Sequence, residues 1–285
     1  MARIKRIKAE GVAFYHVVSR IANKAFLLKD ARRKSVFVNM LHRAAEFSGV
    51  DVATYVVMDN HFHLCVRVPK KIDEVPEAEI LRRVGILYGE ERMKLLEKQF
   101  TAYRDSGNDS RVEAELARFR ARMGDLSEFM KTFKQRVSQW YNSNFDHEGT
   151  LWGGRFKSVL VEDGRYLRNL VAYIHGNPIR AGLATRVADY EWSAPGAAAK
   201  GDNRVLKGLS LLGGGGELAG GGEFTVRDGR FSNGMIIGGK QFVNDMARRH
   251  ALCFGEIAVK VKPHILGLTK TYATHGQRSL SVTAA

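Results

Sequence analysis

The sequence predicts an α+β fold in which a small antiparallel sheet carries helices on one face. Short apolar segments rich in β-branched and aromatic residues alternate with segments of helical periodicity. The strand-like segments are too interrupted for a doubly wound parallel sheet. After residue 195 the composition changes, and thirteen glycines fall between residues 200 and 239.

The first 70 residues predict a strand, a helix and two further strands. Residues 11–20 have the composition of a strand, and residues 32–49 place apolar side chains at helical spacing before Gly49 ends the helix. Residues 51–69 predict two strands joined by a turn at Asp59–Asn60.

The next 75 residues are charged and helix-periodic, and they predict two or three helices. Phe129, Phe133 and Val137 recur at steps of four, which is typical of a core stripe. We interpret residues 71–135 as a helical insertion within a domain that spans residues 1–195.

A short strand and a helix complete that domain. The helix begins near residue 165 and is expected to stop at the Gly-Asn-Pro sequence of residues 176–178. Its apolar stripe is Leu167, Leu170, Val171 and Ile174, and a second stripe holds Tyr166, Asn169, Tyr173 and Asn177. Beyond it we expect a glycine-rich linker over residues 196–240 and a small helical or disordered extension over residues 241–285.

The chain is strongly basic, with a formal net charge of +15 and a pI near 9.9. A polyanion, and nucleic acid first, is the expected partner, although a solubilising surface is the alternative. No lipidation signal, amphipathic membrane helix or long apolar run is present, so no membrane partner is expected. Two cysteines are too few for a disulfide framework, and a reducing, cytoplasmic setting is expected.

Two histidines, His61 and His63, flank Phe62 in the middle of an apolar strand. Side chains alternate faces along a strand, so both imidazoles project from one face, with Cβ atoms roughly 7 Å apart. Such a pair could bind one divalent metal ion. The alternative is that each is an ordinary buried or surface histidine.

Four ordered blocks then resemble a known family. "YHVVSRIANK", "YVVMDNHFHL", "GTLWGGRFKS" and "YIHGNPIRAGL" are similar to the signatures of single-tyrosine HUH transposases of the insertion-sequence type, and more closely to the REP-associated tyrosine transposases. The resemblance spans residues 14–193. It implies a ferredoxin-like HUH nuclease core.

The resemblance also implies the roles of individual residues. His61 and His63 would be the metal ligands, Tyr173 the nucleophile, and Asn177 the carboxamide that completes a site for Mg²⁺ or Mn²⁺. The enzyme would be a metal-dependent single-stranded DNA endonuclease and strand transferase that cleaves and rejoins hairpin-forming, REP-like DNA through a 5′-phosphotyrosine intermediate.

Two other functions stay open from the residues alone. One is a catalytically silent, domesticated protein that binds hairpin DNA, and the other is a phosphodiesterase that uses the histidines and a metal to activate water. Relatives of this kind act as monomers or homodimers, and both states are compatible with the sequence.

Basic residues in or beside the four blocks are the expected DNA contacts. Arg20, Arg155 and Lys157 lie within blocks that resemble the family, and Arg155 could instead pair with a carboxylate. The N-terminal residues Arg3, Lys5 and Arg6 could hold phosphates or form a solubilising tail.

Overall fold

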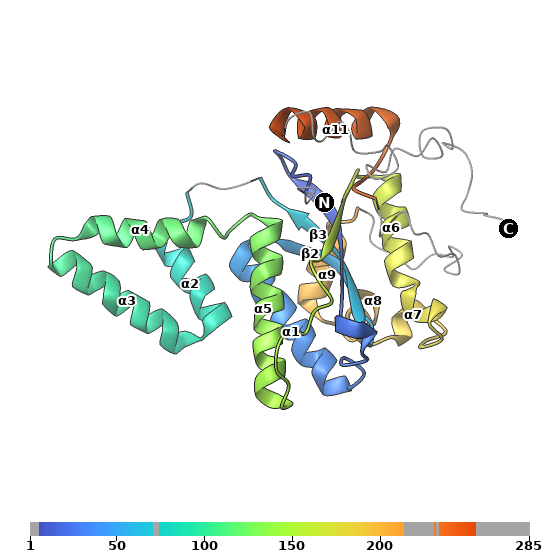
Figure 1. The fold of residues 1–285 in the computed structure, drawn as a ribbon, viewed down its shortest axis with the longest axis horizontal. Helices are drawn as coiled ribbons and strands as arrows, with labels where there is room; N and C mark the ends of the chain where they lie inside the picture. Colours follow the sequence, from blue (N-terminus) through green and yellow to red (C-terminus); the bar gives the residue numbers. More distant parts are fainter. Residues whose placement is uncertain (1–5, 71–73, 214–230, 232–233, 255–285) are drawn as a thin grey trace. The chain divides into compact units, whose positions relative to one another are not determined.

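The computed structural model describes residues 6–70, 74–213, 231 and 234–254 (Figure 1). The chain divides into two compact units, each of which has most of its contacts within itself. The first unit comprises Met1–Lys34, Val52–Arg67 and Trp152–Ala285, and the second comprises Ser35–Asp51 and Val68–Leu151.

The first unit is built on a five-stranded sheet with the order β2-β3-β1-β4-β5. The strands are β1 (Ala13–Arg20), β2 (Asp51–Val57), β3 (His61–Val68), β4 (Lys157–Val161) and β5 (Ile236–Ile237). β1 and β4 are antiparallel, but β4 and β5 are parallel. The expectation of a purely antiparallel sheet is therefore wrong, because a two-residue strand from the glycine-rich region joins the edge in parallel.

Strand β1 is buried on both of its faces. Every residue from Ala13 to Ser19 is buried, and only Arg20 is exposed. A strand covered on one face would alternate between buried and exposed residues. The expectation of helices on one face alone does not describe this strand, whose apolar run is continuous rather than alternating.

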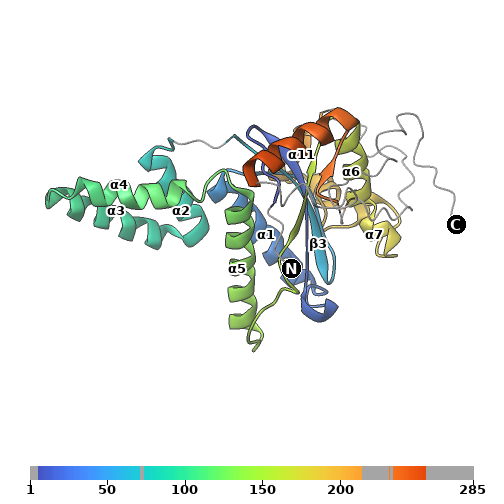
Figure 2. The same cartoon turned by 45° about the horizontal axis from the view of Figure 1, so that its top comes forward.

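One face of the sheet packs against helix α6 (Arg165–His175), which lies alongside it in Figures 1 and 2. The shared core contains Phe14 of β1, Cys65 of β3 and Val159 of β4. The predicted apolar stripe of the helix is confirmed: Leu167, Leu170, Val171 and Ile174 are all buried in this core. Helix α6 is thereby held against the central strands.

Short elements complete the first unit. They are the 3₁₀ turns at Ala22–Lys24 and Val187–Asp189 and the helices α7 (Asn177–Arg180), α8 (Ala194–Ala199), α9 (Asn203–Ser210) and α11 (Lys240–Phe254). Helix α9 and β5, with most of α8, fall within the segment that the sequence presents as a linker. The central part of that segment, residues 214–230, and the end of the extension, residues 255–285, lie outside the described residues.

The second unit is helical. Its helices are α1 (Ala31–Ser48), whose first turn belongs to the first unit, α2 (Glu77–Tyr88), α3 (Glu90–Asp105), α4 (Asp109–Arg120) and α5 (Leu126–Asn144). Glycines with positive φ, Gly89 at 99° and Gly107 at 71°, separate α2 from α3 and α3 from α4. These breaks give four helices, α2 to α5, in the described part of residues 71–145, where the sequence predicts two or three.

The predicted aromatic stripe of α5 lies in the core of this unit. Phe133 contacts Phe37 of α1 edge to face, with ring centroids 4.9 Å apart, and Phe129 lies alongside it. All three rings are fully buried. Aromatic packing of this kind links α5 to α1 and confirms the interpretation of the stripe as core.

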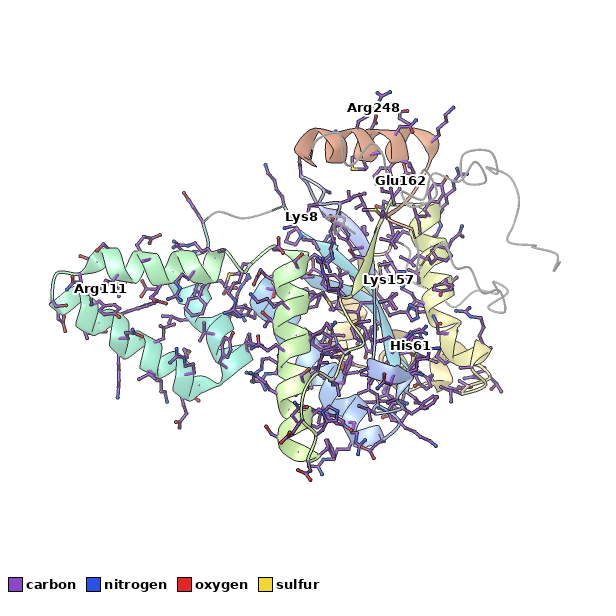
Figure 3. The ribbon with its side chains drawn as sticks, in the orientation of Figure 1. Lys8, His61, Arg111, Lys157, Glu162 and Arg248 are labelled. Carbon is purple, nitrogen blue, oxygen red and sulfur yellow. The ribbon has the colours of Figure 1, made fainter. Side chains whose placement is uncertain are left out.

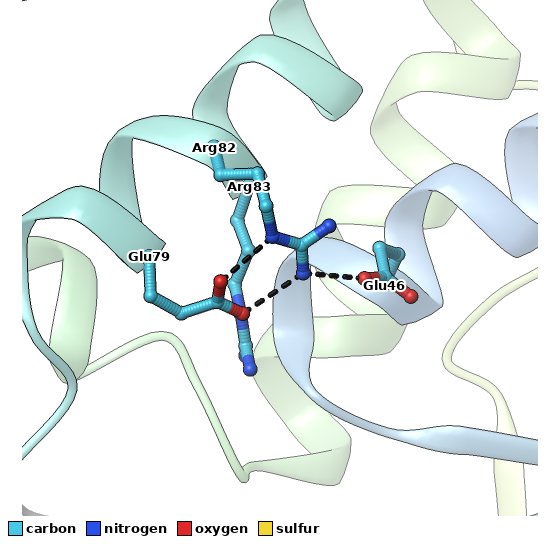
Figure 4. Close-up of polar contacts among 4 residues, drawn as sticks. All are labelled: Glu46, Glu79, Arg82 and Arg83. Carbon is cyan, nitrogen blue, oxygen red and sulfur yellow. Dashed lines mark hydrogen bonds and ion pairs between the residues drawn. The ribbon is translucent and has the colours of Figure 1, made fainter.

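An ion-pair network on the surface joins α2 to α1 (Figure 4). Arg82 contacts Glu79 at 2.7 Å and Glu46 at 2.6 Å, and Arg83 contacts the other oxygen of Glu79 at 2.6 Å. The hydrogen bond from Arg82 holds the pKa of the Glu79 carboxyl down at about 2. Because Arg82 and Glu46 are half exposed, the network fixes geometry more than it adds stability.

Substitution of Gly208 tests how helix α9 packs. A Cβ atom at Gly208 would lie 2.2 Å from the carbonyl oxygen of Val52. We expect Gly208→Ala to lower the free energy of unfolding by about 1–3 kcal/mol in chemical denaturation, because neither backbone can yield easily.

The sign of the change is decisive. On an unpacked helix the same substitution would raise stability by up to about 1 kcal/mol, since alanine favours helices over glycine. Gly11→Ala is the matched control, because a Cβ there meets nothing within 4 Å. A gain in stability for Gly208→Ala would contradict the packing of α9 on β2.

Candidate active site

Three histidines gather on neighbouring strands at the centre of the sheet. His16 lies on β1, and His61 and His63 lie on β3, which is adjacent to β1. His16 is fully buried and His63 is 3% exposed, whereas His61 is partly exposed. The two predicted histidines therefore have a third imidazole beside them.

Each imidazole is held by a specific hydrogen bond. His16 Nε2 lies 2.9 Å from His63 Nδ1, and His16 Nδ1 lies 2.6 Å from the carbonyl oxygen of Phe231. His61 Nδ1 lies 2.7 Å from Asn60 Oδ1. In both predicted ligands the Nδ1 atom is thus engaged, so Nε2 is the nitrogen that could bind a metal.

Burial keeps these imidazoles neutral. Loss of hydration lowers the pKa of His16 from 6.5 to about 4, and burial with the nearby charge of Arg20 lowers the pKa of His61 to about 4. The pKa of His63 is also well below its ordinary value, first through burial and then through its histidine neighbours. A neutral imidazole is the form that coordinates metals.

Helix α6 brings Tyr173 to the same place. Its ring lies edge-on to His63, with centroids 5.7 Å apart, and edge-on to His16 at 6.0 Å. Phe231 packs against the ring at 4.8 Å, and the guanidinium carbon of Arg180 lies 4.8 Å from the ring centroid. The predicted nucleophile therefore lies beside a predicted ligand 110 residues away in sequence.

Asn177 occupies the first position of α7, one turn after Tyr173. Its Nδ2 donates to the carbonyl oxygens of Tyr173 at 3.0 Å and Ile174 at 3.1 Å. Arg180 donates to the Tyr173 carbonyl as well, at 2.6 Å. These contacts fix the end of α6, and an amide that donates to those carbonyls directs its oxygen away from them. A metal-binding role for Asn177 stays a prediction.

The side chains at this place could bind a divalent ion only in a site where other molecules supply some of the ligands. Among the residues that the structure describes, no group of three or more His, Cys, Asp or Glu side chains is placed to hold a metal. Two neutral imidazoles, His61 and His63, are the protein donors that lie together, with ring centroids 5.1 Å apart. Further oxygen ligands would come from an amide, water or a phosphate, which Mn²⁺ and Mg²⁺ accept.

The turn before His61 is held from several directions. The Asp59 side chain pairs with the buried Lys34 at 2.6 Å, and the carbonyl oxygens of Asp59 and Asn60 accept hydrogen bonds from backbone N–H groups. The Lys34 ammonium also lies 4.6 Å from the ring centroid of Trp192. These contacts limit how far His61 can move.

The predicted DNA contacts lie at several positions of the first unit. Arg20 is exposed at the end of β1, and Lys157 is exposed at the start of β4. Figure 3 labels Lys157 and, at the start of β3, His61. Arg155 is exposed in the preceding loop. Arg6 covers the Phe156 ring, with its guanidinium carbon 3.6 Å from the centroid.

The remaining predicted contacts, Arg3 and Lys5, lie outside the described residues.

The helical insertion has no net charge, unlike the rest of the chain, because residues 71–135 contain thirteen Lys or Arg and thirteen Asp or Glu. The net charge of +15 therefore resides entirely outside the insertion. Within the described residues, no helix combines the length and apolarity needed to cross a bilayer.

Sequence reasoning missed His16 and Asn60 as parts of the site. A signal for His16 was present, because an imidazole in the continuous apolar run of residues 13–18 must be buried and must then find a hydrogen-bond partner. Nothing in the sequence identified that partner. The carbonyl of Phe231 lies 215 residues further along the chain.

Comparison with solved structures finds a distant likeness. A REP-associated tyrosine transposase bound to a REP hairpin aligns with 80% of this chain and 96% of its own, with a TM-score of 0.45 and 15% sequence identity. No protein-family model and no curated protein matches the sequence.

The lowered histidine pKa values predict acid sensitivity between pH 6.5 and 4. Unfolding exposes His16 and His61, whose pKa then returns towards 6.5 from about 4 in the folded chain. The unfolded state binds protons first as the pH falls, so the stabilisation is complete above pH 6.5 and is lost towards pH 4. We expect a loss on the order of a few kcal/mol in the free energy of unfolding.

His16→Gln isolates one of the two groups. The variant lacks one proton-binding site of the unfolded chain, so its unfolding free energy should change less steeply over the same pH range. Denaturant titrations at half-unit pH steps measure both slopes. Equal slopes would show that His16 is not neutralised by burial.

Proposed function

We propose that this chain is a metal-dependent single-stranded DNA endonuclease and strand transferase of the REP-associated tyrosine transposase type. The contact between the rings of Tyr173 and His63 supports the proposal, because the proposed nucleophile would then lie beside one of the two proposed metal ligands. The strongly basic composition supports a nucleic-acid substrate. REP-like hairpin DNA is the proposed substrate.

Tyr173 would attack the scissile phosphorus through its phenolic oxygen. A phenol with an ordinary pKa near 10 is a weak nucleophile at neutral pH, so the reaction needs help. A divalent ion held by His61 and His63 would polarise the phosphate and offset the charge on its oxygens. The surrounding rings of His16 and Phe231 limit the orientations of the tyrosine ring.

The proposed reaction exchanges one phosphate ester bond for another, so it needs no external energy source. The tyrosine oxygen bonds to phosphorus, the bond from phosphorus to the 3′-oxygen breaks, and that oxygen leaves as a 3′-hydroxyl after taking up a proton. The phenolic proton passes to solvent. A second 3′-hydroxyl can attack the 5′-phosphotyrosine and restore the phenol, so cleavage and joining use the same site.

Arg20 and Arg180 supply positive charge near this reaction. Both side chains contribute to the lowered pKa of His63, which indicates that their charges act at its position. A phosphate brought to Tyr173 would be attracted by the same charges. We propose that these arginines hold the scissile phosphate against the ring.

Tyr173→Phe should remove the covalent adduct while leaving hairpin binding within about twofold, because one hydroxyl is lost and the aromatic packing is kept. The measurement uses labelled single-stranded hairpin DNA with Mn²⁺ and a denaturing gel that shows label on the protein. Tyr166→Phe, on the same helix, is the control and should retain the adduct.

The other outcomes discriminate between functions. An adduct in Tyr173→Phe would move the nucleophile elsewhere. Metal-dependent cleavage without an adduct in the parent would favour activation of water, and binding without cleavage would favour a silent hairpin-binding protein.

A second prediction concerns the basic surface. Arg155→Gln should weaken hairpin binding and reduce the slope of log affinity against log salt by about 0.7–0.9, the value for one phosphate contact. Lys98→Gln, an exposed lysine on α3 in the neutral insertion, is the charge-matched control and should leave both unchanged. Equal effects of the two substitutions on a salt titration would contradict a localised DNA surface.

A further inference from the structure

The groups around His16, His61 and His63 determine which ring nitrogen of each histidine carries a hydrogen atom. A carbonyl oxygen can only accept a hydrogen bond, so the contact between Phe231 O and His16 Nδ1 requires a hydrogen on Nδ1. His16 is fully buried, and because a charged imidazole there would lose its hydration, the neutral ring with one ring hydrogen is the favoured form. Its Nε2 atom is therefore an acceptor.

This acceptor determines the tautomer of His63. The facing atoms, His16 Nε2 and His63 Nδ1, are 2.9 Å apart, while the ring centroids are 5.1 Å apart and the planes differ by 8°. The rings thus meet edge to edge, which suits a direct N–H···N hydrogen bond. His63 must donate from Nδ1, and its Nε2 then carries the lone pair.

A separate set of contacts acts on His61. The Asn60 side chain donates from Nδ2 to the carbonyl oxygen of Lys24 at 3.2 Å, which fixes the orientation of its amide. Its Oδ1 faces His61 Nδ1 at 2.7 Å and can only accept. His61 must also donate from Nδ1, and its Nε2 carries the lone pair.

We propose that His16 and Asn60 are positioning residues that hold His63 and His61 in the tautomer with hydrogen on Nδ1, so that both Nε2 atoms face a divalent metal ion as donors. The proposal rests on the proposed function for the identity of the ligand, but the tautomers are a property of the metal-free chain. Both hydrogen-bond chains end on backbone carbonyls, which cannot exchange the donor and acceptor roles.

Nuclear magnetic resonance of the ¹⁵N-labelled, metal-free protein tests the tautomers directly. Long-range ¹H–¹⁵N correlations should show Nδ1 protonated and Nε2 bare in His61 and His63 at pH 7.5. Protonated Nε2 in either residue would overturn the proposal, whatever the protein does with DNA.

Variants with and without an acceptor test the positioning residues. Asn60→Ala removes the acceptor for His61 and should give a mixture of tautomers with about 10- to 100-fold weaker binding of Mn²⁺ by electron paramagnetic resonance titration. Asn60→Asp keeps an acceptor oxygen and should retain the tautomer and most of the affinity. Identical tautomers and affinity in Asn60→Ala would overturn its role.

His16 is tested in the same way. His16→Phe removes the acceptor for His63 and should lose the Nδ1 tautomer there, whereas His16→Gln keeps an acceptor and a donor and should restore it in part. If His16→Phe does not fold, the Asn60 pair and the parent spectrum still decide the proposal. Failure of the proposed function appears differently, as correct tautomers and Mn²⁺ binding without a Tyr173 adduct.

Discussion

The burial of two neutral imidazoles on adjacent central strands is the constraint on which the site depends. His16 and His63 cannot be hydrated there, and an unpaired polar group in that position would cost free energy on the order of 1–3 kcal/mol. Each therefore takes the other as a partner, and the carbonyl of Phe231 completes the chain. That requirement ties β1, β3 and a distant C-terminal residue into one arrangement.

This arrangement leaves His16 and His63 on the face of the sheet where α6 packs. The apolar stripe of α6 fixes the rotation of the helix against the sheet, so the stripe beside it carries Tyr173 to the imidazoles. The extra contacts of Asn177 and Arg180 with the Tyr173 carbonyl reinforce the end of the helix. The proposed nucleophile and metal site would require rigid support of this kind, because both would depend on sub-ångström placement.

The net charge of the helical insertion differs from that of the rest of the chain. The helical insertion has equal numbers of acidic and basic residues and uses several of them in ion pairs with one another, as in the contacts of Arg82 with Glu79 and of Arg104 with Glu77. All of the net positive charge belongs to the remaining residues. An insertion without net charge adds little long-range attraction for a polyanion, so electrostatic attraction of the proposed DNA substrate would fall to the rest of the chain.

The sequence by itself determined the order of the main elements, the apolar stripe of α6, and the presence of two histidines on one side of β3, because periodicity and alternation are local properties of the chain. It did not determine β5, α8 and α9, which are too short or too rich in glycine to give a periodic signal. Only the tertiary structure decided that His16 pairs with His63, that Asn60 faces His61 and that Tyr173 lies against them. The contacts of His16 and Tyr173 with His63 join separate elements, and no local pattern encodes such partners; Asn60 is next to His61 in the chain, but the orientation of its amide depends on the carbonyl oxygen of Lys24.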